Sequence, residues 1–232
     1  MAALLGVGAA AGCVSVLPEA GPAPEIYRLN DGTAELARSS VGDAAAPSAD
    51  WALSVPEPIA PSALATDRIA VVTGGAGISY AAGARWSESA PRMLQERVLT
   101  AFEDDAGVRA AVRPEDGVAT RFELRLELLR FEAVYPAGGA GAPTAQVSVR
   151  AKLVDRDDRV LAASRRLEAN RRADANALGD IIAAFDAASS EVSRELARWT
   201  AVSGEDSLAD SADGGTDGGA AQPSASAASS SR

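Results

Sequence analysis

The 232-residue sequence contains no histidine. A Ser-His-Asp triad or a Cys-His pair therefore cannot form, and metal sites that depend on histidine are excluded as well. Cysteine occurs once, at Cys13, so no disulfide can form within the chain. A single cysteine does not reveal the redox compartment.

Basic side chains are scarce relative to acidic ones. The chain has 22 Lys and Arg against 32 Asp and Glu, a net charge of −10. Nucleic-acid binding depends on clustered Lys and Arg that neutralise phosphates, so we expect no nucleic-acid partner. Apolar residues make up 47% of the chain, which is enough for a packed core in one or two domains.

The amino-terminal segment is short and apolar. Residues 2–12 read AALLGVGAAAG, which is too short to span a bilayer but is typical of the apolar region of a signal peptide. The basic leader that normally precedes such a region is missing. Either translation starts further upstream or the segment is not a signal, and we predict a truncated signal peptide over residues 1–12.

Cys13 directly follows this apolar run, behind Ala11 and Gly12. Its two interpretations are a lipidated cysteine and a free, buried one. The small residues before it fit a lipoprotein signal peptidase, although Ala10 stands where the usual lipobox has leucine. Three prolines follow in residues 14–24, which indicates an extended tether. We therefore predict a lipidated cysteine and a proline-rich tether over residues 13–25.

A folded domain is expected over residues 26–202. Strands are predicted at 51–55, 67–73, near 78–80, 122–135, 147–153 and 160–167, because apolar residues alternate or run together there. In the strand at 122–135 the alternation slips by one residue at Leu129, which predicts a β-bulge. The strand at 67–73 is almost wholly apolar and is expected to be central and buried on both faces.

Apolar stripes at spacings of three and four predict helices over about 90–105 and 176–199. The fold class is therefore α+β, with a mainly antiparallel sheet and two amphipathic helices packed on one face. Residues 203–232 are rich in Ser, Gly, Ala and Asp, and we predict a disordered acidic tail there.

The segment from Arg68 to Ser79, RIAVVTGGAGIS, invites comparison with a dinucleotide-binding turn. Gly75 and Gly77 supply G-x-G, but Tyr80 occupies the place of the third glycine, and no helix opens directly after the turn. A flexible hairpin turn explains the glycines more simply, since glycine tolerates a positive φ.

Two acidic clusters are candidates for metal or catalytic sites. Glu103, Asp104 and Asp105 close the first helix, and Asp155, Asp157 and Asp158 lie in a turn that lacks the glycine and distal glutamate of a calcium loop. Solvated charges explain both clusters. We therefore expect no catalytic residue, no cofactor-binding residue and no metal ligand.

Residues 67–105 carry a family resemblance. The segments TDRIAV at 66–71, SYAAGARW at 79–86 and PRMLQ at 91–95 resemble the signature of the ABC-type transport auxiliary lipoproteins. The likeness continues through Phe131 and Glu132, the hairpin at 147–167 and a final helix that ends at Trp199. It covers about residues 26–200.

The resemblance implies a non-catalytic, lipid-anchored periplasmic subunit that accompanies an ABC permease and ATPase and a mammalian-cell-entry (MCE) domain protein in lipid transport. Val14 follows the cysteine, and by the rule for enteric lipoproteins this favours the outer membrane over the inner one. The alternatives are a lipid-binding module that carries phospholipid itself and a small oxidoreductase that uses the glycine turn. The sequence does not decide whether the chain forms a homo-oligomer.

Tyr80, Arg85 and Trp86 are the residues we expect to contact a partner, because Tyr, Arg and Trp are the usual anchors of interfaces. The competing interpretation is structural. In that case Trp86 packs at the corner between strand and helix, and Arg85 pairs with a carboxylate.

Overall fold

The computed structural model describes residues 23–29, 49–75, 77–105, 107–137 and 139–214. The predicted signal peptide, Cys13 and most of the tether lie outside the described residues, as does the tail beyond Gly214. The described elements are, in chain order, β1 (Glu25–Tyr27), β2 (Ala52–Ser54), β3 (Arg68–Thr73), β4 (Ile78–Trp86), α2 (Ala90–Asp105), β5 (Ala110–Val112), a 3-10 turn (Pro114–Asp116), β6 (Phe122–Tyr135), β7 (Thr144–Asp155), β8 (Val160–Arg172) and α3 (Leu178–Gly214).

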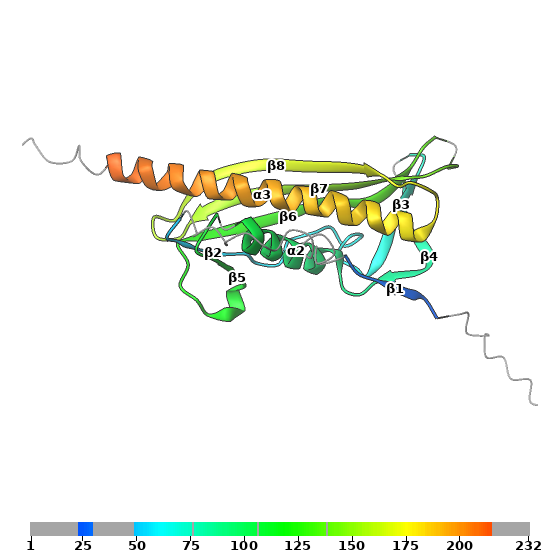
Figure 1. Ribbon diagram of the computed structural model, residues 1–232, viewed down its shortest axis with the longest axis horizontal. Coiled ribbons are helices and arrows are strands. Elements are labelled where there is room, and N and C mark those ends of the chain that lie inside the picture. Colours follow the sequence, from blue (N-terminus) through cyan, green and yellow to red (C-terminus); the bar gives the residue numbers. More distant parts are fainter. Residues whose placement is uncertain (1–22, 30–48, 76, 106, 138, 215–232) are drawn as a thin grey trace, which may run out of the picture.

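The strands form one mixed sheet (Figure 1). Its long pairings, β6 with β7 and β7 with β8, are antiparallel, as is the β3–β4 hairpin. Shorter parallel pairings join β1 to β4, β2 to β5 and β6, and β3 to β6. The antiparallel pairings dominate, so the predicted fold class is confirmed, and the parallel pairings of the short strands are an addition to it.

The change of phase in β6 is a β-bulge. The register of β6 against β7 shifts between Leu128 and Arg130, so that Leu129 is the extra residue. The bulge keeps Leu124, Leu126 and Leu128 on the core side before it, and Phe131 and Ala133 on the same side after it. The bulge predicted from the slipped alternation is therefore confirmed.

The β3–β4 hairpin confirms the turn interpretation of the glycine-rich segment. Gly74 and Gly75 adopt φ values of 63° and 111°, which favour glycine over other residues. A second strand follows the turn, where a dinucleotide-binding motif requires a helix. β3 is central, between β4 and β6, but Val71 and Val72 are only half-buried, so burial on both faces is incomplete.

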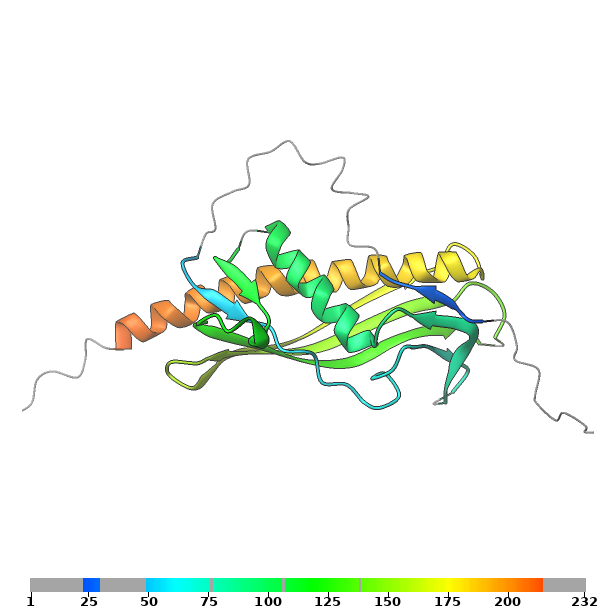
Figure 2. The ribbon, with the colours of Figure 1, turned by 90° about the horizontal axis from the view of Figure 1, so that it is seen from below.

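Both helices cover the same face of the sheet (Figure 2). α2 begins and ends at the predicted residues, and its buried stripe includes Leu94, Val98 and Phe102. α3 lies along β7 and β8 and contacts α2. The opposite face of β6, β7 and β8 carries alternating charged side chains, of which Arg125 pairs with Glu123 and Arg150 pairs with Glu127.

The prediction of disorder from Ser203 onward is wrong for residues 203–214. These residues continue α3 to Gly214, 15 residues beyond the predicted end at Trp199. Tertiary contacts stabilise this part of the helix, because Trp51 packs on Gly204 and Leu208 packs against the core. Most helical stability in proteins comes from such packing rather than from propensity.

Candidate functional site

The three residues predicted to contact a partner lie on β4, but they do not form one surface. Trp86 is 2% exposed, and its ring packs edge-on against Phe131 and Phe185 at centroid distances of 5.6 and 5.2 Å. A side chain enclosed in this way is a core residue and is not accessible to a partner. For Trp86 the structural interpretation therefore replaces the predicted interface role.

Arg85 and Tyr80 both make contacts within the domain. Arg85 is exposed and donates two hydrogen bonds to the Asp67 carboxylate, at 3.1 and 2.9 Å. These bonds lower the pKa of Asp67. The Tyr80 hydroxyl donates to the carbonyl oxygen of Ala63 at 3.2 Å, and the Arg68 guanidinium lies 3.7 Å from the centre of its ring. A partner role for Tyr80 and Arg85 stays a prediction.

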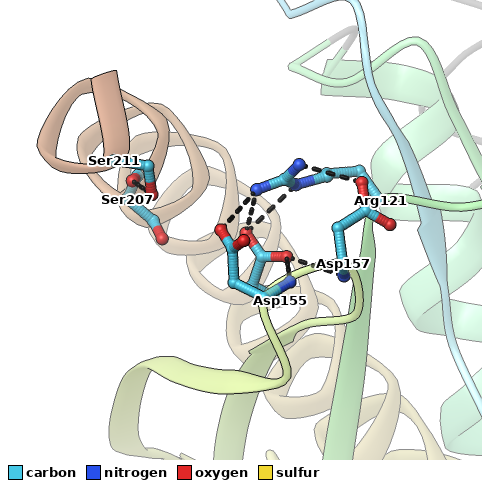
Figure 3. A network of polar contacts seen from close by, with 6 residues as sticks. Arg121, Asp155, Asp157, Ser207 and Ser211 are labelled. Atoms are coloured by element: carbon cyan, nitrogen blue, oxygen red, sulfur yellow. Dashed lines mark hydrogen bonds and ion pairs between the residues drawn. The ribbon is translucent and has the colours of Figure 1, made fainter. Parts of the chain in front are cut away.

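The acidic turn between β7 and β8 surrounds one arginine (Figure 3). Arg121 precedes β6, and its guanidinium donates to Asp155 at 3.0 and 2.6 Å, to Asp157 at 2.8 Å and to Asp158 at 3.0 Å. The hydrogen bond from its guanidinium to the Asp155 carboxylate raises the pKa of Arg121. The network fastens the β7–β8 turn to the loop before β6.

The expectation that this cluster is solvated is wrong for Asp155. Its side chain is fully buried, and its Oδ1 accepts hydrogen bonds from the backbone N–H groups of Asp157 and Asp158 at 2.9 and 3.1 Å. All the acceptor capacity of Asp155 is thus used by the turn and by Arg121. In the described part of the chain, no three His, Cys, Asp or Glu side chains are grouped so that they could hold a metal ion.

A buried ion pair joins the two helices. Arg97 of α2 is 7% exposed and contacts the carboxylate of Asp186 on α3. Two exposed pairs, Arg165–Glu195 and Arg171–Glu191, join β8 to α3. These ion pairs orient α3 on the sheet and on α2, and none of them places a carboxylate free to act on a substrate.

The carboxyl-terminal end of α3 is the part of the molecule that sequence analysis missed. The Trp51 indole N–H donates to Glu205 at 2.9 Å. A Cβ on Gly204 would lie 2.4 Å from the same ring, so only glycine allows this close approach. The signal that could have predicted this extension is the near-helical spacing of Trp199, Gly204 and Leu208. It continues the apolar stripe of α3, but with fewer large apolar residues than the first part of the helix.

A groove of about 390 Å³ lies beside this end of α3. Four residues at the start of β8 line one side, and α3 lines the other with Ser203, Asp206, Ser207, Asp210 and Ser211. Figure 3 shows Ser207 and Ser211 on the side of α3 that faces the β7–β8 turn. The Ser211 hydroxyl is used within the helix, since it donates to the carbonyl oxygen of Ser207 at 2.9 Å.

No helix within the described ranges combines the length and the apolar character needed to cross a bilayer.

A family model described as "ABC-type transport auxiliary lipoprotein component" matches residues 30–197. This match confirms the resemblance seen in the sequence.

Solved structures and a sequence relative agree with the family match. Protein XCC0632 from Xanthomonas campestris, a DUF330 protein, is 28% identical with a TM-score of 0.66, over 81% of this chain and 97% of that one. An uncharacterized protein of known structure shares the fold, with a TM-score of 0.57 and 13% identity, over 76% of this chain and 98% of that one.

The sequence relative is the uncharacterized protein bll6063 of Bradyrhizobium diazoefficiens. It is 28% identical over 150 residues, which is 65% of this chain and 39% of that protein. This chain therefore spans about two fifths of the length of that relative.

Proposed function

We infer the function of this chain from one premise: it belongs to the ABC-type transport auxiliary lipoprotein component family, whose model covers residues 30–197. We propose that it is a non-catalytic, lipid-anchored accessory subunit in the periplasm, associated with an ABC permease and ATPase and an MCE-domain protein. Lipid is the proposed cargo of that system, and the outer membrane is the proposed location, following Val14.

The family match carries this proposal, and the geometry of the domain supports it. The acidic side chains that the fold brings together around Arg121 are occupied by ion pairs and by backbone hydrogen bonds. The glycine-rich segment is a hairpin turn. We therefore expect the domain to act through surfaces that contact other proteins, while its polar clusters stabilise the fold.

The alternative is a module that carries phospholipid itself. Such a module needs an apolar cavity large enough for acyl chains. The rings of Trp86, Phe131 and Phe185 fill the core where α3 meets the sheet. Lipid co-extracted from the purified chain in stoichiometric amount would favour this alternative.

Replacing Cys13 with alanine tests the anchor. We expect the chain that retains Cys13 to sediment with membranes. The Cys13→Ala variant should appear in the soluble periplasmic fraction, because it cannot form a thioether bond to a lipid. Intact mass of the chain that retains Cys13 should show the added acyl groups. Equal membrane association of both chains, without added mass, would contradict lipidation.

Co-purification tests the function. A carboxyl-terminal tag on the full chain, expressed in its own organism and extracted in mild detergent, should recover the ABC permease, the ATPase and the MCE-domain protein. An unrelated lipoprotein with the same tag is the control. Recovery of the chain without any transport component would remove the proposed function.

A further inference from the structure

α3 extends past the end of the strand on which it packs. Its 37 residues span about 55 Å at 1.5 Å per residue, whereas the 13 residues of β8 span about 43 Å. The helix runs antiparallel to β8, so its last turns project beyond the β7–β8 turn (Figure 1). Trp51 packs on one side of this end of the helix, where it contacts Gly204 and Glu205.

The other side borders the groove of about 390 Å³. We call this the α3–β8 groove, and its floor is formed by Val160, Leu161, Ala162 and Ala163 of β8. Val160 and Leu161 are 51% and 57% exposed, although both are large and apolar. The two exposed residues and the two alanines after them leave an apolar floor that a bound segment can cover.

The wall of the groove is acidic. Asp206 and Asp210 line it from α3, and neither carboxylate has an ion-pair partner among the described residues. Glu205 is the residue before Asp206 in the helix, and no basic residue lies in the last turn. Negative side chains are unfavourable at a helix carboxyl terminus, because the helix dipole is negative there. A cationic partner would relieve this repulsion.

We propose that the α3–β8 groove binds a segment of a partner protein that presents apolar side chains flanked by lysine or arginine. The apolar residues of the segment would cover Val160 and Leu161, and its basic residues would pair with Asp206 and Asp210. Ser203, Ser207 and Ser211 line the helix side with small side chains, which leave room for a bound segment to approach the helix closely. That the partner is a component of the transport system rests on the proposed function.

The residues that follow α3 in the sequence are not a suitable segment. Residues 215–232 contain one acidic and one basic residue, Asp217 and Arg232, and no large apolar side chain. A second copy carries the same net charge of −10, so its approach to an acidic groove is electrostatically unfavourable. Charge complementarity therefore favours a different, basic protein.

Photo-crosslinking in membranes tests the groove. A photoreactive phenylalanine analogue at position 161 of the full lipidated chain should crosslink to one of the co-purified transport components. The same analogue at Ile78, which is 41% exposed in the β3–β4 hairpin at the other end of the sheet, should not. The charge variant Asp206→Lys with Asp210→Lys should reduce the crosslink from position 161 about tenfold.

A second measurement does not depend on the transport system. A labelled peptide of about ten residues in which leucine alternates with lysine should bind the purified full chain, by fluorescence anisotropy. The matched control is Glu103→Lys with Asp104→Lys, which changes the net charge equally at two exposed acids outside the groove. We expect about a tenfold weaker Kd for the groove variant and little change for the control.

Three results would overturn the groove proposal: equal weakening by both charge variants, no weakening by either, or a crosslink between two copies of the chain. Failure of the chain without substitutions to co-purify with transport components is a different result. It removes the proposed function, while the peptide measurement still decides whether the groove binds a basic apolar segment.

Discussion

Replacing Trp86 with alanine should lower the free energy of unfolding by about 3–5 kcal/mol. The ring is 2% exposed and contacts both Phe131 of β6 and Phe185 of α3, so its removal leaves a cavity where sheet and helix meet. Urea denaturation of the full chain in the Cys13→Ala background, followed by circular dichroism, measures the change.

Two neighbouring substitutions make the experiment selective. Arg85→Ala removes an exposed ion pair with Asp67 and should change the free energy of unfolding by less than about 1 kcal/mol. Trp86→Phe should be milder than Trp86→Ala, because the buried indole N–H of Trp86 has no hydrogen-bond partner to lose. An unchanged urea midpoint for Trp86→Ala, together with lost partner binding, would restore the interface role.

The regular parts of the fold were predictable because they follow local periodicity. The slipped alternation at Leu129 located the β6 bulge, and the stripe of Leu94, Val98 and Phe102 located α2. Strict two-residue and 3.6-residue patterns arise wherever one face of an element is buried. The family resemblance was also visible, because its residues cluster in β3, β4 and the start of α2.

The short parallel strands were not predictable in their pairing. β1, β2 and β5 each have three residues, and their partners lie far away in the sequence. For example, Leu53 pairs with Phe122 and Ala111 at the same time. Three residues carry too little pattern to specify a partner, so tertiary packing decides the pairing.

The sites were predicted less well than the fold, because burial of a polar or amphipathic side chain depends on distant residues. Trp86 was expected on an interface and lies in the core, and Asp155 was expected in solvent and is buried. Gly204 lets the end of α3 pack on Trp51, and the α3–β8 groove borders the same end of the helix. No local pattern joins residue 51 to residue 204.

Replacing Asp155 with alanine should destabilise the domain by about 3 kcal/mol, the lower end of the range for breaking a buried ion pair. The substitution leaves Arg121, which is 25% exposed, without its closest partner. It also leaves the backbone N–H groups of Asp157 and Asp158 without an acceptor. Chemical denaturation should show a lower midpoint with an unchanged slope.

Asp157→Ala is the matched control, since Asp157 pairs with the same arginine but is 63% exposed, and its loss should change stability by less than about 1 kcal/mol. A double-mutant cycle of Arg121→Ala and Asp155→Ala then separates the ion pair from the turn. If the pair dominates, the double variant should be little less stable than Asp155→Ala alone. Equal effects of Asp155→Ala and Asp157→Ala would show that burial of Asp155 contributes nothing, and that the turn is held by the summed charge around Arg121.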